Sequence, residues 1–344
     1  MNKKRLIIFG IGLAVTFLIV SYLRKDAPRL FHIQGQTMGT IIYNVKYVAS
    51  EVDGLDAMIS QELRDFNQSL STYISDSEIS RLNKTGSLTY ESKFIYPVLK
   101  ASKEVFDQTR GTFDPSLGPL VQAWGFGPDK NVPNPDSAKV DSLKAVIGFG
   151  RVSFDENQVS LPTNFQLDFS AIAKGYAVDV VAELLEEKGI ENYMVEIGGE
   201  VRCRGRNDQD KPWALGIEDP TVQSNEQKLM AIVRLKNLSL ATSGNYRNYF
   251  EKEGKIYAHI IDPRTGYTAK HNLLSASVFA SDCMTADAYA TAFMVLGLEY
   301  SKEIMNAQNL DAILIYRSEN GIESFVSEGI RPFLEMNNAE GELK

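Results

Sequence analysis

AKGYAVDVVAELLEEKGIENYMVEIGGEVRCRG, residues 173–205, decides the fold class of this chain. Its first part, Ala173–Lys188, has the apolar spacing of a helix and stops at Gly189. Strand-like segments then follow one another: Tyr193–Ile197, Val201–Arg204, Ala214–Glu218 and Leu229–Leu235. A helix followed by several adjacent strands favours an α+β fold with mixed or antiparallel sheets over a doubly wound parallel fold.

The flanking sequence extends this pattern in both directions. Further strands are predicted at Thr40–Val48, Arg151–Phe154, Gln166–Asp168, Lys255–Ile261 and Leu274–Ala280. Further helices are predicted at Glu51–Phe66, Ser92–Thr109 and Met284–Leu296. Between them lies a Gly- and Pro-rich stretch, Gly111–Pro135, which contains FDPSLGPLVQAWGFGP. A loop of this length inside a compact chain is often functional.

Composition limits the functional classes. The 344 residues are 44% hydrophobic and 23% charged, which is ordinary for a folded globular protein and excludes long disorder and collagen-like repeats. A mean hydropathy of −0.19 excludes a polytopic membrane protein. The formal net charge is −8, although residues 1–28 hold five Lys or Arg and one acidic residue. The rest of the chain is therefore more acidic still, which argues against nucleic acid as a partner.

The N-terminal segment predicts the location. Leu6–Leu23 has eighteen residues without a charge, and basic residues flank it on both sides. This pattern is typical of a signal peptide or a single membrane anchor over residues 1–28. An uncleaved anchor is favoured because no small-x-small cleavage site follows. The N-terminal cations favour an inner-membrane anchor with the folded domain, residues 29–344, on the periplasmic or extracytoplasmic side.

The segment Leu167–Asp179, LDFSAIAKGYAVD, is the first candidate for chemistry. We expect a strand to bring Asp168 to a tight turn, after which a helix opens near Lys174. The free N–H groups of a helix start attract an anion, and a lysine there strengthens the attraction. Gly175 would allow close approach of a ligand or another backbone. The alternative is that Asp168 or Ser170 simply caps the helix.

His259 is the second candidate. It lies just before the turn sequence Asp262–Gly266, DPRTG. A histidine can act as a general base near neutral pH. The alternative is a hydrogen-bonded histidine of the core or of a sheet edge. The chain has only three histidines, so a His-rich zinc site is not expected.

Asp287 and Thr291 form the third candidate, since they are spaced i, i+4 on one predicted helix face. A carboxylate and a hydroxyl are hard oxygen ligands, and Mg²⁺ takes few protein oxygens beside water and phosphate. The alternatives are that Asp287 interacts with the helix dipole and that Thr291 bonds its own i−4 carbonyl. No GxGxxG, GxxxxGK[ST] or GxSxG motif is present, which removes the Rossmann, P-loop and α/β-hydrolase interpretations.

Taken together, the segments resemble the ApbE family, the FAD:protein FMN transferases. Eight segments that occur in the family's order carry the resemblance: Met38-Gly39-Thr40, Ser71–Asn83, Phe113–Gly127, Leu167–Asp179, Val195–Gly205, Leu240–Phe250, His259–Gly266 and Met284–Gly297. The resemblance implies a two-lobed, ApbE-like (T-fold-like) α+β domain over residues 29–344, preceded by one N-terminal hydrophobic helix.

The resemblance also implies a reaction. FMN is transferred from FAD to a Ser or Thr hydroxyl of an acceptor protein, AMP is released, and Mg²⁺ is required. The family's acceptors are typically exported subunits of the Na⁺-translocating NADH:quinone reductase and of Rnf-type complexes, which fits an exported, membrane-tethered domain. Two alternatives stay open: an FAD pyrophosphatase that uses water as acceptor, and a tethered flavin-binding protein without catalytic activity.

The family's functional residues can be carried over position by position. Magnesium would be held by the backbone carbonyl of Ala171 and by Asp287 and Thr291. Lys174 and the helix start would face the pyrophosphate. His259 is the best candidate in this sequence for taking the proton of the acceptor hydroxyl, and we treat that role as a hypothesis. The residues expected to contact FAD are Met38, Tyr73, Ala123, Trp124, Gly125, Asp168, Lys174 and Ile261.

Overall fold

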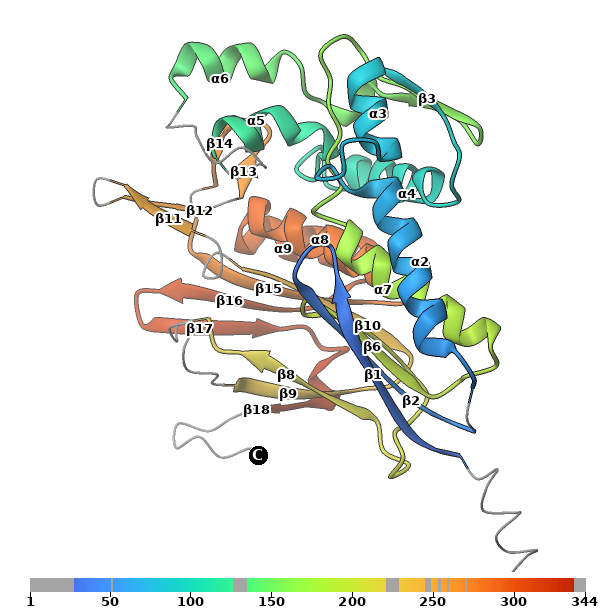
Figure 1. Cartoon of the computed structure of the whole chain (residues 1–344). Coiled ribbons are helices and arrows are strands. Elements are labelled where there is room, and N and C mark those ends of the chain that lie inside the picture. Colours follow the sequence, from blue (N-terminus) through green and yellow to red (C-terminus); the bar gives the residue numbers. More distant parts are fainter. Residues whose placement is uncertain are drawn as a thin grey trace, which may run out of the picture.

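The computed structural model describes residues 28–50, 52–125, 135–220, 229–244, 249–252, 255–258, 260–269 and 271–336. An eight-stranded, wholly antiparallel sheet forms its centre, in the order β1-β2-β6-β7-β10-β15-β16-β17 (Figure 1). These strands are β1 (Arg29–Thr37), β2 (Ile41–Ala49), β6 (Tyr193–Ile197), β7 (Glu200–Arg204), β10 (Leu238–Gly244), β15 (Leu273–Ala280), β16 (Asp311–Ser318) and β17 (Gly321–Val326).

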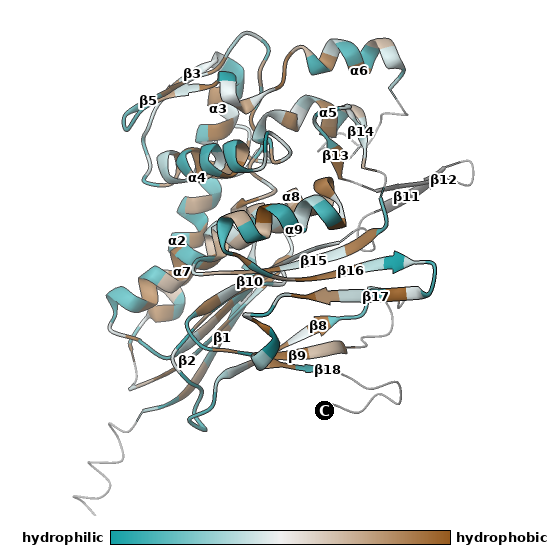
Figure 2. Cartoon of the chain, turned by 180° about the vertical axis from the view of Figure 1, so that it is seen from behind, coloured by the Kyte–Doolittle hydropathy of each residue, from teal (hydrophilic) through white to brown (hydrophobic). Residues whose placement is uncertain are grey.

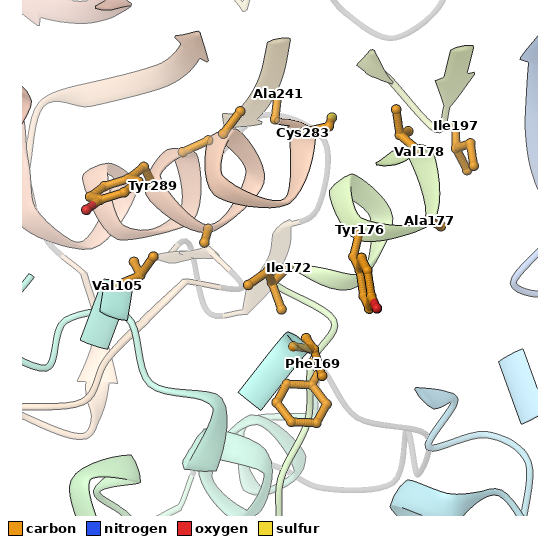
Figure 3. Close-up of a cluster of buried hydrophobic side chains, with 14 of the residues drawn as sticks. Val105, Phe169, Ile172, Tyr176, Ala177, Val178, Ile197, Ala241, Cys283 and Tyr289 are labelled. Carbon is orange, nitrogen blue, oxygen red and sulfur yellow. The ribbon is translucent and has the colours of Figure 1, made fainter. Parts of the chain in front are cut away.

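Both faces of this sheet are covered. Helices α7 (Ala173–Glu187) and α8 (Cys283–Leu296) pack side by side on one face (Figure 1). Figure 3 shows Ile172, Tyr176 and Cys283 among the buried apolar side chains around these two helices. The other face packs on a three-stranded sheet of β8 (Trp213–Glu218), β9 (Leu229–Leu235) and β18 (Leu334–Met336). Because both faces of the sheet are covered there, β15 is buried along nearly its whole length and lacks the alternation of a half-exposed strand.

A helical layer lies over α7 and α8. It contains α2 (Leu55–Leu70), α3 (Glu78–Thr85) and α4 (Ile95–Gln108), with short strands β3 (Ser87–Thr89), β4 (Ser153–Phe154) and β5 (Gln158–Ser160). Helix α9 (Leu298–Gln308) instead packs beside α8 and against β16 of the central sheet. Beside the helical layer are α5 (Gly118–Ala123), α6 (Ser137–Lys144), β13 (Ile261–Asp262) and β14 (Tyr267–Thr268). Strands β11 (Tyr249–Lys252) and β12 (Lys255–Ala258) form a separate pair. Figure 2 shows that α4 and α9 alternate hydrophobic and hydrophilic residues, as helices packed on one side do.

The α+β class with antiparallel sheets is confirmed, but two local predictions were wrong. No strand forms at Gln166–Asp168, because an amide side chain replaces the partner strand. Asn83 accepts the backbone N–H of Leu167 at 2.7 Å and donates to its carbonyl at 2.8 Å. The second error concerns Gly111–Pro135, which is not simply a loop. Its described part contains a 3₁₀ turn at Pro115–Leu117, capped by Asp114, and helix α5.

The predicted signal or anchor segment cannot be compared with this fold. Residues 1–27 lie outside the described ranges, so the hydrophobic helix expected within residues 1–28 is not placed. Among the helices that are described, none has the length and hydropathy needed to cross a bilayer.

His271 ties the loop before β15 to the end of α8. Its Nε2 donates to the carbonyl of Met294 at 2.6 Å, and its Nδ1 accepts the N–H of Leu273 at 3.2 Å. Both contacts fit the neutral ring, since an imidazolium cannot accept a hydrogen bond. Burial lowers the pKa of His271 below its ordinary value.

The depressed pKa of His271 predicts a pH-dependent stability. Its contribution is complete above about pH 6.5, the pKa in the unfolded chain, and is lost as the pH falls through the folded-state value. Urea unfolding of the wild-type chain between pH 7.5 and 5.5 should therefore show a greater loss of unfolding free energy than that of His271→Gln. The difference is at most about 1.4 kcal/mol per pH unit for one group. Equal losses in the two proteins would contradict this assignment.

Candidate active site

The first turn of α7 and the first turns of α8 meet at Gly175. Its backbone N–H donates to Oδ2 of Asp287 at 2.9 Å. A Cβ added at Gly175 would lie 2.2 Å from the carbonyl oxygen of Cys283 and 2.7 Å from Cβ of Asp287. Only glycine therefore fits at position 175 without moving the two helices. The hydrogen bond from its N–H holds the Asp287 carboxylate against the start of α7.

Thr291 lies one turn beyond Asp287 on α8. Its hydroxyl is 3.4 Å from the carbonyl oxygen of Ala171, just before α7, and 3.4 Å from Oγ of Ser243 in β10. The structure thus brings together Ala171, Asp287 and Thr291, the three residues that the sequence predicts as metal ligands. Ser243 is an additional hydroxyl that the sequence interpretation did not include.

The donor chemistry of this group fits Mg²⁺. All its donors are hard oxygens, and two ligands at 2.0–2.1 Å from an octahedral Mg²⁺ lie about 3 Å apart. Oδ1 of Asp287 has no hydrogen-bond donor within the described parts of the chain, so one carboxylate oxygen is free for a cation. The described ranges contain no metal-holding cluster of three or more His, Cys, Asp or Glu side chains. The candidate set differs because it combines one carboxylate, one hydroxyl and one carbonyl.

Lys174 brings positive charge to the same place. Its ammonium forms an ion pair with Glu200 at the start of β7, whose side chain is only 2% exposed. Burial raises the pKa of both Asp287 and Glu200, and the charge of Lys174 opposes that shift. Burial lowers the pKa of Lys174, but the two carboxylates raise it overall, so the lysine is a cation at neutral pH. The sequence interpretation missed Glu200, although it follows the noticeable pair Gly198-Gly199.

Asp179 fixes the position of α8 relative to α7. Its carboxylate accepts the backbone N–H groups of Cys283 at 2.9 Å and Met284 at 2.7 Å, and it forms a 2.8 Å ion pair with Arg202. Asp282 caps the same helix end through the N–H of Thr285 at 2.8 Å. The sequence does not predict the contact between Asp179 and the start of α8, because nothing in it distinguishes Asp179 from an ordinary polar residue of a helix.

Two hairpin turns lie against the start of α7. The N–H of Gly198 donates to the carbonyl of Ile42 at 3.2 Å. A Cβ built at Gly198 would lie 2.9 Å from Ile41 and 3.6 Å from Cδ of Lys174. Met38 is in the neighbouring turn between β1 and β2, with a positive φ of 48°. Met38, a predicted FAD contact, is thus in the turn that joins β1 to β2, and β2 contains Ile41 and Ile42.

The other predicted FAD contacts have varied environments. Tyr73 is 75% exposed, in the loop between α2 and α3. Trp124 is 4% exposed, and its Nε1 donates to the carbonyl of Gly266 at 2.9 Å. Trp124 and Ile261 belong to one small apolar cluster with Leu120, so most of the indole surface is already covered. Ala123 ends α5, and Gly125 follows with a φ of 83°.

Asp168 and His259 complete the predicted set. Oδ1 of Asp168 accepts the N–H of Ser170 at 2.8 Å, which is a local turn contact. The helix cap considered as the alternative role does not form, because Ile172 is the N-cap of α7 and no side chain of the described residues caps that helix start. The side chain of Asp168 remains half-buried before α7. His259 lies outside the described residues, so its predicted role has no structural counterpart here.

Comparison with known proteins identifies the family. The ApbE family model matches residues 38–314. FAD:protein FMN transferases of Vibrio cholerae and Haemophilus influenzae are 37% and 36% identical to this chain. These alignments cover 93% and 96% of this chain, and 97% and 98% of the relatives.

Solved structures show the same fold. The flavin transferase ApbE of V. cholerae superposes with a TM-score of 0.79 at 35% identity, over 89% of this chain and 99% of that one. The apo form of the Pseudomonas stutzeri flavinyl transferase ApbE gives a TM-score of 0.80 at 32% identity, over 89% and 97% of the two chains. The matched range contains the described candidate site, from Met38 to Thr291. The chain therefore belongs to the ApbE family.

Proposed function

We propose that this protein transfers FMN from FAD to a Ser or Thr hydroxyl of an acceptor protein, with Mg²⁺ as cofactor and AMP as the second product. The convergence of Ala171, Asp287 and Thr291 beside Lys174 carries the proposal. A carbonyl, a carboxylate and a hydroxyl oxygen that lie beside a lysine and a helix start support a site for a divalent cation. The relatives named FAD:protein FMN transferase support the assignment of substrate and acceptor class.

Each group of candidate residues has a separate role in the proposed reaction. Ala171, Asp287 and Thr291 would hold Mg²⁺, which supplies charge neutralisation for the pyrophosphate. The ammonium of Lys174 and the N–H groups at the start of α7 would bind and orient the phosphate oxygens. We assign to His259 the removal of the proton from the acceptor hydroxyl. As the P–O bond to the acceptor oxygen forms, the bond to AMP breaks and AMP leaves with the displaced oxygen.

The proposal includes the cellular setting. We propose that residues 1–28 anchor the protein in the inner membrane or direct its export, with the domain on the extracytoplasmic side. Its acceptors would be the exported flavin-carrying subunits of the Na⁺-translocating NADH:quinone reductase or of Rnf-type complexes. The uncharged segment Leu6–Leu23, with basic residues before and after it, supports this location.

An assay with FAD, Mg²⁺ and a flavin-free acceptor subunit tests the activity. In-gel flavin fluorescence of the acceptor, together with AMP release, is expected to depend on Mg²⁺ and to disappear with a chelator. AMP and free FMN without acceptor labelling would instead identify an FAD pyrophosphatase. Binding of FAD without any AMP would identify a flavin-binding protein and contradict the proposed reaction.

His259→Asn tests the proposed base. The variant is expected to transfer FMN more slowly and to lose the rise of the rate with pH that deprotonation of an imidazole produces. The rate of acceptor labelling should be measured between pH 5.5 and 8.5 for both proteins, with His32→Asn as a matched variant of an exposed histidine. A fully active His259→Asn protein with an unchanged pH profile would remove this residue from the mechanism.

A further inference from the structure

Glu200 is a buried carboxylate whose partners do not account for its burial. Its side chain is 2% exposed, while that of its ion-pair partner Lys174 is 30% exposed. Oε1 contacts the Lys174 ammonium, but within the described residues Oε2 is inaccessible and has no hydrogen-bond partner. Burying a carboxylate is unfavourable, and a single ion pair offsets that cost poorly. A purely structural role would be filled better by an apolar side chain of similar size.

The position of Glu200 determines where the Lys174 ammonium can go. Lys174 is the second residue of α7, and the next residue, Gly175, binds Asp287. The lysine side chain runs past Gly198, where an added Cβ would lie 3.6 Å from Cδ of Lys174 and 3.7 Å from Oε2 of Glu200. Its ammonium thus ends at the β6–β7 turn on Glu200. Asp287 is bound instead by a neutral backbone N–H.

Two buried carboxylates therefore compete for one lysine. Both Asp287 and Glu200 raise the pKa of Lys174, so both attract its charge. A lysine that moved onto Asp287 would cover the carboxylate oxygen that is otherwise free for a cation. It would also withdraw from the place where a phosphate oxygen could reach it.

We propose that Glu200 is a positioning residue that holds the Lys174 ammonium away from Asp287, so that Asp287 stays available to Mg²⁺ while Lys174 stays available to phosphate. This inference rests on the proposed function, because it assumes that Ala171, Asp287 and Thr291 bind Mg²⁺. The inference predicts that Lys174 lowers the affinity for Mg²⁺ once the charge of Glu200 is removed.

Calorimetric titration of the full chain with MgCl₂ alone tests the inference without any turnover. Glu200→Gln keeps the size of the side chain but removes its charge. It should weaken Mg²⁺ binding at least roughly tenfold, because the released ammonium of Lys174 then competes with the cation for Asp287; a loss of this size is at the lower end of what changes outside the ligand shell of a metal cause. Adding Lys174→Met to Glu200→Gln removes the competing cation and should restore binding to near the wild-type affinity. Such a rescue is not expected if Glu200 only stabilises the fold.

The remaining outcomes are decisive as well. Wild-type Mg²⁺ affinity in Glu200→Gln, or equally weak binding in the double variant, would overturn the inference. If Glu200→Gln does not fold, Glu200→Asp with and without Lys174→Met replaces it. Aspartate keeps the charge but is one methylene shorter, so it holds the Lys174 ammonium less well, and weaker Mg²⁺ binding that Lys174→Met restores is again expected. If the variants show the rescue pattern but the wild-type chain labels no acceptor, the proposed function alone is contradicted. A wild-type chain that binds no Mg²⁺ would overturn both.

Discussion

Asp287→Asn is expected to reduce flavin transfer at least about 100-fold, since loss of even an outer partner of a metal ligand costs 10–100-fold. Asparagine has the shape of aspartate, and its carbonyl oxygen can still accept the Gly175 N–H that Asp287 binds at 2.9 Å. It cannot supply the negative charge that a hard divalent cation requires. The rate of acceptor labelling and the calorimetric affinity for Mg²⁺ should therefore fall together.

The same variant is expected to be at least as stable as the wild-type chain. Burial raises the pKa of Asp287, so the folded chain holds this proton more tightly than the unfolded chain does. At neutral pH, ionisation of Asp287 therefore opposes folding, and an uncharged amide avoids that cost. Asp282→Asn is the matched control, because asparagine can keep the cap at the start of α8. Normal transfer by Asp287→Asn, or equal losses in the two variants, would refute the assigned ligand.

Gly175→Ala is expected to damage both the fold and the site. The new Cβ would lie 2.2 Å from a backbone oxygen of α8, and backbone cannot move aside as the end of a flexible side chain can. The helices must separate, which costs about 1–3 kcal/mol or more in unfolding free energy. The separation also moves Asp287 away from Ala171. Urea unfolding and acceptor labelling should both show the loss.

Gly118→Ala is the control for this substitution. Gly118 has right-handed helical dihedral angles at the start of α5, and an added Cβ would meet its nearest neighbour at 3.7 Å, an ordinary contact. Removing glycine from a helix stabilises it by up to about 1 kcal/mol. Gly118→Ala should therefore be neutral or slightly stabilising. A stable and active Gly175→Ala chain would mean that α7 and α8 are not packed as described.

The spacing of apolar residues predicted those helices and strands whose conformation depends on their own sequence and not on a distant partner. β9 has the predicted bounds Leu229–Leu235, and α8 begins one residue before the predicted start at Met284. The failure at Gln166–Asp168 has a different origin. There the chain is extended, but its partner is the amide of Asn83, 84 residues before Leu167. No pattern within a window of neighbouring residues reports such a contact.

The residues of the candidate site also divide into those that the sequence could predict and those that it could not. Asp287 and Thr291 could be predicted because both lie on one helix, and Ala171 through the family resemblance. Glu200 and Asp179 could not, because their roles depend on partners that only the folded chain brings near. Glu200 reaches Lys174 across 26 residues, and Asp179 reaches Cys283 across 104. The sequence shows an acid at each place without showing what it binds.

The contact between Asp179 and the start of α8 has a consequence for the order of events during biosynthesis. A ribosome has completed α7 about a hundred residues before it adds Cys283 and Met284, and contacts so distant in sequence form late and slowly. Until then α7 lacks its neighbouring helix, and neither Asp287 nor Thr291 exists. A nascent or C-terminally truncated chain that ends before Asp287 therefore contains Lys174 and the start of α7 but lacks two of the proposed cation ligands, so we expect activity only from chains that extend beyond Thr291.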